Sequence, residues 1–332
     1  MTSLRPLLLL PLLAVGLLAA APAGKTYLGA IVTDAESGKI IFQDSADEIS
    51  PPASMTKLMT FAVLHDKLAR GALTLQTQVK VTRADAKVGA MRDSTSVWLR
   101  EGEVFSVEDL LYAMMIRSAN DAAYALACFS AGSPEAFVEL MNAKAKALGM
   151  THTTFRSPHG LPPPSRRIAD GDLTTPRDYA NLCRYLVLET DVTKYTSVRA
   201  RDFGPNRPKG PEHMENHDHL LGKIPGLDGL KTGYTSGAGF CLSATAERNG
   251  RRIIAIVMGS PSRQIRDVKV TELIERGFAS LPAEVSVKTD QRAALALPAP
   301  TEIIPTVSTD KSAPATPPST IEPLTFHVNP PH

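Results

Sequence analysis

The chain has 332 residues, of which 43% are hydrophobic, enough for one large hydrophobic core or two smaller ones. Its 36 Lys and Arg residues nearly balance its 34 Asp and Glu residues, and no basic run is interleaved with aromatic residues. We therefore expect no nucleic-acid partner.

The first 23 residues are predicted to be a secretory signal peptide. A single arginine precedes a leucine-rich stretch, small residues follow, and Ala-Pro-Ala at 21–23 offers a cleavage site before Gly24. The alternative is cleavage after Ala21, at a second site of this kind formed by residues 19–21. An uncleaved anchor ranks second, because the apolar run is shorter than the ~20 residues that a membrane-spanning helix needs. We therefore expect the protein to be exported.

The packed region is predicted to begin with a hairpin and a helix. Two β-rich runs surround a turn at residues 36–38. Two prolines at 51–52 oppose helix, apolar residues then recur at helical spacing over 58–68, and Gly71 is a natural terminator. Ser54 is therefore expected in or just before the first helical turn.

The middle of the chain is predicted to be mainly helical. Apolar residues recur at helical spacing there, and Ser or Thr precedes several of these runs as a cap. The sequence predicts short strands near 77–82 and 95–99, two helices around a break at Arg117–Asn120, a helix from Pro134 to Gly149, a loop over 151–174, and a helix from Pro176.

Strand patterns return near the end, at 226–235, 239–248 and 251–260, and an amphipathic stretch follows at 264–281. Strands at both ends with helices between them predict an α+β fold, an antiparallel sheet covered by helices with a helical subdomain. From residue 284 the chain is rich in proline and threonine. Residues 284–332 are therefore predicted to be a disordered tail after a domain spanning 24–283.

The three cysteines do not form the pattern of a disulfide framework, because their number is odd and they are sparse. Cys128 and Cys183 lie in helical patterns and Cys241 lies in a strand pattern. We expect all three to be small buried hydrophobic residues.

Three short motifs carry groups suited to chemistry. Ser54 and Lys57 are three residues apart and share a helix face. Ser118-Ala119-Asn120 stands at the predicted helix break, and Lys231-Thr232-Gly233 lies in a strand pattern. Each motif alone is as well explained by a helix cap, a solvated lysine or a bulge. Together and in this order they are close to the motif set of penicillin-binding proteins and class A β-lactamases.

The resemblance extends over residues 25–282, which are similar to the low-molecular-mass penicillin-binding proteins, the serine-type D-alanyl-D-alanine carboxypeptidases. In that family a five-stranded antiparallel sheet is flanked by helices, with a helical lobe across the active-site cleft. The stretches that carry the resemblance are "PPASMTKLMT", "IRSANDAA", "FVELMNAKAKALGM", "SPHGL" and "PGLDGLKTGYTSGAGFCLSATA".

The resemblance implies a set of catalytic groups. Ser54 would attack the peptide carbonyl between two D-alanines, and Lys57, in a dry cleft near other cations, would take its proton. Ser118 would relay that proton toward the leaving amine. Asn120 would bind the substrate's peptide group. The backbone N–H groups of Ser54 and Tyr234 would form the oxyanion hole.

Further residues are assigned to substrate binding and support. Lys231 would supply positive field, Gly233 lets another group approach the strand closely, and Thr232 would bind the terminal carboxylate together with Arg266. His159 in "SPHGL" and Asp178 in "TPRDYA" match family positions with supporting roles only. A lone loop histidine is ordinarily solvated. The expected partners are peptidoglycan stem peptides and, as covalent inhibitors, β-lactams, in the periplasm or cell-wall space.

The sequence departs from the family at two places. The tail is too short and proline-rich for the β domain or the amphipathic anchor helix that relatives often carry, which argues against membrane attachment. The segment "HMENHDHLL" at 213–221 replaces Asn-x-Asn-x-Leu-Leu of relatives. Its three histidines with Glu215 and Asp218 could bind zinc, but the family needs no metal, and we expect neither a metal nor a cofactor.

Two other functions are alternatives on the same fold. A β-lactamase shares the nucleophile and fold, yet class A enzymes use a loop glutamate for deacylation, and residues 156–175 contain none. Ala119 also stands where those enzymes have aspartate. A non-catalytic cell-wall scaffold on the same fold is the other alternative, but all the chemical groups are present.

Overall fold

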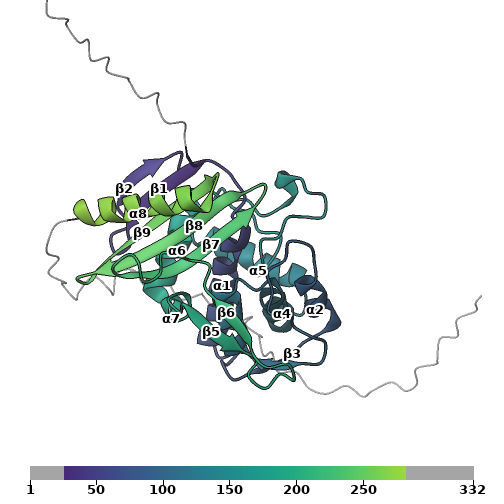
Figure 1. The fold of residues 1–332 in the computed structure, drawn as a ribbon. Helices are drawn as coiled ribbons and strands as arrows, with labels where there is room; N and C mark the ends of the chain where they lie inside the picture. Colours follow the sequence, from purple (N-terminus) through teal and green to yellow (C-terminus); the bar gives the residue numbers. More distant parts are fainter. Residues whose placement is uncertain (1–25, 282–332) are drawn as a thin grey trace, which may run out of the picture. The chain divides into compact units, whose positions relative to one another are not determined.

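The computed structural model describes residues 26–281 (Figure 1). These residues fall within the domain predicted over 24–283. The predicted signal peptide, residues 1–23, and the predicted tail, residues 284–332, lie outside the described residues, so both stay predictions.

A five-stranded antiparallel sheet is built from the two ends of the described region, in the strand order β2-β1-β9-β8-β7. The first hairpin and the last three predicted strands supply all of it, which confirms the α+β fold class. The strands are β1 (Gly29–Asp34), β2 (Ile40–Asp44), β7 (Leu227–Thr235), β8 (Gly239–Arg248) and β9 (Arg251–Ser260).

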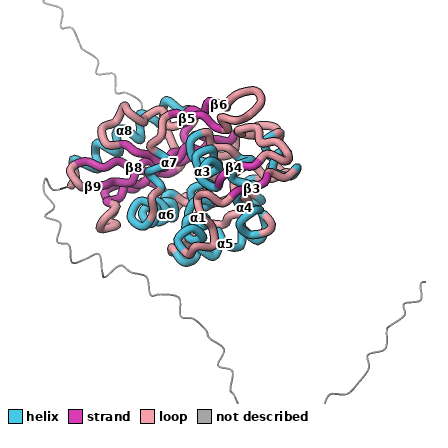
Figure 2. Tube along the Cα trace, turned by 90° about the horizontal axis from the view of Figure 1, so that it is seen from below, coloured by secondary structure: helices cyan, strands magenta, loops and turns pink. Residues whose placement is uncertain are grey.

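The sheet is buried on both faces, as the central strand β9 makes clear. Because side chains of a strand alternate between faces, Ile254 and Ile256 join the larger hydrophobic cluster while Ile253 and Val257 join a second, smaller one. Helices α6 (Pro176–Glu189) and α8 (Arg263–Ala279) both contact β9, and they lie on opposite sides of the sheet (Figure 2). A continuous apolar run is the pattern expected of such a strand.

The helical region follows the predicted signals closely. Ser106, Ser133 and Thr175 each cap a helix by accepting a hydrogen bond from the backbone N–H three residues on. The predicted break at 117–120 is present. The helices are the 3₁₀ turn η1 (Ala53–Thr56), α1 (Lys57–Ala69), α3 (Val107–Ile116), α4 (Asn120–Ala131) and α5 (Pro134–Ala147).

The prediction of a strand near 95–99 is wrong. This segment is irregular, and its backbone N–H groups at Val97 and Leu99 donate to the carboxylate of Asp121, at 3.3 and 3.0 Å. On the other side Arg207 donates to the Val97 carbonyl at 2.7 Å. Side chains therefore satisfy the backbone where a neighbouring strand would have done so.

Of the small elements that the structure describes, one was predicted. The strand predicted at 77–82 is present as β3, but its partner is β4 rather than residues 95–99. These elements are β3 (Gln78–Lys80), α2 (Arg83–Gly89), β4 (Val104–Ser106), the 3₁₀ turn η2 (Ile168–Asp170) within the predicted loop, α7 (Val192–Thr196), β5 (Ala200–Phe203) and β6 (Glu212–Glu215).

Two of the three cysteines are buried as predicted, and the third is not. Cys183 on α6 and Cys241 on β8 are buried, whereas Cys128 near the end of α4 is half-buried. The last turn of α4 reaches the surface, which explains the difference, since the next residue, Phe129, is also exposed. Partial burial still raises the pKa of the Cys128 thiol to about 11.

Between residues 26 and 281, no helix combines the length and the apolar character needed to cross a membrane.

Asp121 fixes the irregular segment that lines the second motif, so its removal is expected to destabilise the fold. In Asp121→Ala the buried N–H groups of Val97, Leu99 and Ala122 lose their acceptor. We expect the free energy of unfolding to fall by about 3 kcal/mol. Urea denaturation measures this, with the exposed Glu101→Ala as the control. A loss below about 0.5 kcal/mol, the usual range for surface changes, would contradict this role.

Candidate active site

Ser54 lies in a tightly enclosed turn at the start of α1. Two glycines allow this enclosure. A Cβ atom at Gly233 on β7 would lie 2.5 Å from the Pro52 carbonyl oxygen, and one at Gly160 would lie 2.0 Å from that of Ala53. The strand and the loop can therefore close on both sides of the turn only because neither residue has a side chain.

The amine of Lys57 is held beside Ser54 by two further oxygens. Its Nζ lies 3.1 Å from Ser54 Oγ, 2.6 Å from Asn120 Oδ1 and 2.7 Å from the His159 carbonyl oxygen. The amide and carbonyl oxygens can only accept, whereas the serine hydroxyl can also donate. A neutral amine therefore satisfies every partner, with two N–H bonds to those oxygens and its lone pair directed at the Ser54 hydroxyl.

Burial favours this neutral form. Lys57 has no exposed surface, and the pKa of its amine is held well below its usual value by desolvation and by the positive charge of Lys231. The carboxylates of Asp172 and Asp121 act in the opposite direction without reversing the shift.

The second motif forms the junction between α3 and α4. Ser118 is buried and has a left-handed backbone with φ 61°, two residues before Asn120 begins α4. The Asn120 amide donates to Ser94 Oγ at 3.1 Å, and its backbone N–H donates to the Thr95 carbonyl at 2.8 Å. The amide oxygen is thereby turned toward Lys57.

The third motif lies on β7, next to the turn that carries Ser54. Lys231 is buried, and its amine donates to the Thr232 carbonyl at 3.1 Å. Burial lowers the pKa of Lys231 to about 7; the Asp218 carboxylate opposes this shift and the Arg266 guanidinium adds to it. Tyr234 is exposed and stacks on Phe240 of β8 at 4.2 Å between ring centroids.

Arg266 reaches the sheet from α8. It is buried and donates to the carbonyl of Cys241 at 3.3 Å and to the carboxylate of Asp267 at 2.5 Å. Cys241 pairs with Gly233 in the sheet, so the guanidinium lies one strand away from the third motif. The structure thus brings Arg266 near Lys231 but engages it in an ion pair that sequence reasoning did not foresee.

His159 is not the solvated loop residue expected from the sequence. Its ring stacks on Tyr124 with centroids 6.3 Å apart, and its Nδ1 accepts from the Leu161 N–H at 3.1 Å. Desolvation, with the charge of Lys57, lowers the pKa of His159 to about 3. The ring is therefore neutral, and the residue reaches the site through its carbonyl contact with Lys57.

Asp178 lies in the first turn of α6 and holds the loop rather than the nucleophile. Its carboxylate accepts from the His152 backbone N–H at 2.8 Å and from Thr153 Oγ1 at 2.7 Å. Its supporting role in the reaction stays a prediction.

Sequence reasoning did not assign a role at the site to two residues, the buried Asp172 and the half-buried His217. The Asp172 carboxylate accepts from Thr56 Oγ1 and the Arg156 N–H, both at 2.7 Å, and so ties the loop to the turn of Ser54. His217 lies near Lys231 and Lys57, and desolvation and these charges lower its pKa to about 3. No short motif marks Asp172, and His217 belongs to the 213–221 segment whose sequence suggested a metal rather than this site; the tertiary fold brings both residues to the site.

The histidines at 213–219 have separate partners. His213 contacts Asp202 at 2.7 Å across the β5–β6 pair, while His219 contacts Arg263 on α8 at 3.0 Å. Within the described part of the chain, no three His, Cys, Asp or Glu side chains gather as a metal ion requires.

Comparison with known proteins identifies relatives across most of the described region. A family model described as D-alanyl-D-alanine carboxypeptidase matches residues 20–262. The chain is 32% identical over 265 residues to D-alanyl-D-alanine carboxypeptidase DacF of Bacillus subtilis, covering 80% of this chain and 65% of the relative. It is 36% identical over 263 residues to D-alanyl-D-alanine carboxypeptidase DacC of Escherichia coli, covering 78% of this chain and 63% of the relative. The chain thus spans just under two thirds of these relatives.

Solved structures agree with the fold. Penicillin-binding protein D2 of Listeria monocytogenes, in an ampicillin-bound form, is 33% identical with a TM-score of 0.66, covering 78% of this chain and all (100%) of that one. D-alanyl-D-alanine carboxypeptidase DacD of Francisella tularensis is 26% identical with a TM-score of 0.70, and the match covers 78% of this chain and 72% of that one. From the family match and these relatives, the chain belongs to the D-alanyl-D-alanine carboxypeptidase family of serine peptidases, the low-molecular-mass penicillin-binding proteins.

Proposed function

We propose that this chain is an exported serine carboxypeptidase that removes the terminal D-alanine from peptidoglycan stem pentapeptides and thereby limits cross-linking. The observation that carries the proposal is the buried Lys57 amine, 3.1 Å from Ser54 Oγ and held by two oxygens that can only accept hydrogen bonds. The names of the relatives support the substrate class.

Acylation would begin with the transfer of the Ser54 proton to the Lys57 lone pair. The serine oxygen forms a bond to the carbonyl carbon between the two D-alanines, and the developing oxyanion accepts from the N–H groups of Ser54 and Tyr234. The C–N bond then breaks. The proton passes by way of Ser118 to the leaving amine, so that D-alanine departs and the acyl-enzyme remains.

In deacylation, water would be the nucleophile and the Ser54 oxygen would be the leaving group. Water attacks the ester carbonyl, gives its proton to Lys57, and displaces the Ser54 oxygen, which recovers a proton. Lys231 supplies positive field near the substrate. Thr232, with Arg266, is assigned to the terminal carboxylate, and Asn120 to the peptide group.

β-Lactams would acylate Ser54 by the same first step and act as covalent inhibitors. The ampicillin-bound form of the Listeria protein supports this part of the proposal. A β-lactamase would have to hydrolyse that adduct rapidly, and a non-catalytic scaffold would form none. A stable adduct with fluorescent penicillin therefore separates the three functions. Export rests on the signal peptide predicted at residues 1–23.

The nucleophile and base assignments predict distinct losses. Ser54→Ala should abolish penicillin labelling and D-alanine release, and Lys57→Ala should slow acylation by about 10³-fold, because the serine proton loses its acceptor. Labelling kinetics and D-alanine assays measure both. Lys67→Ala, on the same helix but bonded to the Ser130 carbonyl, is the matched control. Labelling that survives in Ser54→Ala would refute the nucleophile, and acylation within tenfold of wild type in Lys57→Ala would refute the base.

The charge of Lys231 predicts a pH dependence. With its pKa lowered to about 7, the amine is charged below that pH and neutral above it. If acylation needs this charge, kcat/KM, which reports on the free enzyme, should decline as the pH rises through about 7. Lys231→Arg keeps a cation at all these pH values, so the decline should move to higher pH. An identical descending limb in both proteins would rule Lys231 out as its cause.

A further inference from the structure

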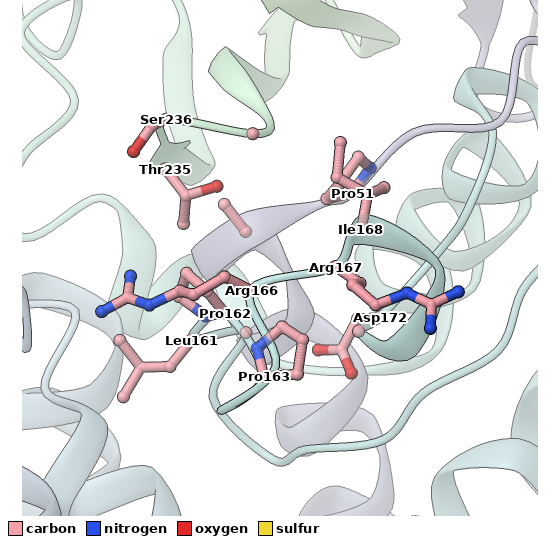
Figure 3. Close-up of a pocket in the computed structure, with 14 residues that line it drawn as sticks. Pro51, Leu161, Pro162, Pro163, Arg166, Arg167, Ile168, Asp172, Thr235 and Ser236 are labelled. Carbon is pink, nitrogen blue, oxygen red and sulfur yellow. The ribbon is translucent and has the colours of Figure 1, made fainter.

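A pocket of about 180 Å³ lies next to the turn that carries Ser54. Its wall includes Ala53 of that turn and Thr235 at the end of β7, and Figure 3 shows Thr235 on the opposite side of the pocket from Ile168. The proposed acylation and deacylation steps do not involve this pocket.

The direction of β7 relates the pocket to the scissile bond. In the proposed complex the oxyanion lies at the Tyr234 N–H, and the terminal carboxylate lies toward Thr232. Residues advance about 3.3 Å each along a strand, so a peptide lying on β7 continues in the other direction past Thr235. The pocket is therefore on the acyl side, where the part of the substrate that stays on Ser54 would extend.

The pocket wall is mainly apolar. Pro162, Pro163 and Ile168 contribute carbon surface, and Ile168 is 52% exposed although it is a large aliphatic residue. Such a surface suits the methylene groups of an acyl side chain, which would cover Ile168 on binding.

Two cations stand in the same wall. Arg166 pairs with Asp93 at 3.8 Å, and Arg167 pairs with Asp170 at 3.9 Å; all four side chains are substantially exposed. Exposed pairs at these distances contribute little to stability. Figure 3 shows the two guanidinium groups directed to opposite sides, and each can exchange its partner for a carboxylate of a ligand, which it can bind with two parallel hydrogen bonds.

The wall also contains one acid, Asp172, whose carboxylate is engaged by the protein. Its oxygens accept from Thr56 Oγ1 and from the N–H groups of Arg156 and Ser157. Asp172 is only 5% exposed, and these hydrogen bonds engage its oxygens with the protein rather than with the pocket.

We infer that this pocket is a subsite for the acyl side of the substrate, in which Arg166 and Arg167 select acyl side chains that carry a free carboxylate. The inference rests on the proposed function, since it takes the acyl-enzyme at Ser54 as given. A stem peptide can present such a carboxylate from a γ-linked glutamyl residue or from a dicarboxylic diamino acid.

Acylation by two penicillins tests the subsite. Benzylpenicillin and its α-carboxy derivative differ only by one carboxylate on the acyl side chain. The second-order acylation rate constants are measured for both compounds in wild type, Arg166→Gln and Arg167→Gln, with Arg83→Gln on α2 as the matched control. We divide the rate constant for the carboxylated compound by that for the neutral compound. This ratio should fall about fivefold in each pocket variant, the scale of an exposed ion pair, and should stay at the wild-type value in the control.

The outcomes separate the subsite from the function. A ratio unchanged in both pocket variants would overturn the subsite while leaving the acyl-enzyme intact. Absence of acylation by either compound in wild type would overturn the proposed function and the subsite with it. Two peptides ending in D-Ala-D-Ala, each with one of the two candidate carboxylates converted to an amide, then identify the source: the amide that removes the effect of Arg166→Gln marks the group that is bound.

Discussion

The structure around the site depends on a lysine amine that has been taken out of water. An isolated charge so deeply buried would cost several kcal/mol, and the protein escapes that cost by favouring the neutral form. Three oxygens from three parts of the fold meet the Lys57 amine: Ser54 on the turn before α1, Asn120 at the start of α4, and His159 on the loop after α5. Removing water thus favours the neutral amine, which can act as a base, while the acceptors hold it beside Ser54.

The rest of the fold holds these parts together. The sheet presents β7 against the turn of Ser54, which requires Gly233, and the loop closes from the other side, which requires Gly160. Behind the loop, the buried Asp172 carboxylate bonds to Thr56 and so keeps the loop carbonyl within reach of Lys57. A buried carboxyl group with satisfied hydrogen bonds acts here as a rigid connector.

Sequence reasoning succeeded where a signal is local. Caps such as Ser133 followed by proline predicted helix starts, alternating and continuous apolar runs predicted the sheet, and three short motifs predicted residues that the structure brings together around Ser54 and Lys57. These signals lie within a few residues of the element that they mark, so they do not depend on tertiary contacts.

Sequence reasoning failed where the deciding contact is distant in the chain. Residues 95–99 have a strand-like pattern, but the Asp121 carboxylate binds their backbone from more than 20 residues away. The pair β5–β6 is largely exposed and polar and so lacks an apolar period. His159 stacks on Tyr124, and Arg266 is paired with its neighbour Asp267; these contacts depend on the positions of side chains, which the sequence pattern does not give.

A lowered pKa of the Lys57 amine in the free protein is what makes it a base, and NMR titration of the lysine side chains measures that pKa. With ¹³C at the lysine ε-carbons, the Lys57 signal is assigned by its loss in Lys57→Arg, and its shift is followed with pH. We expect a midpoint well below the ordinary lysine value. A Lys57 midpoint near the ordinary lysine value of about 10.4 would contradict it.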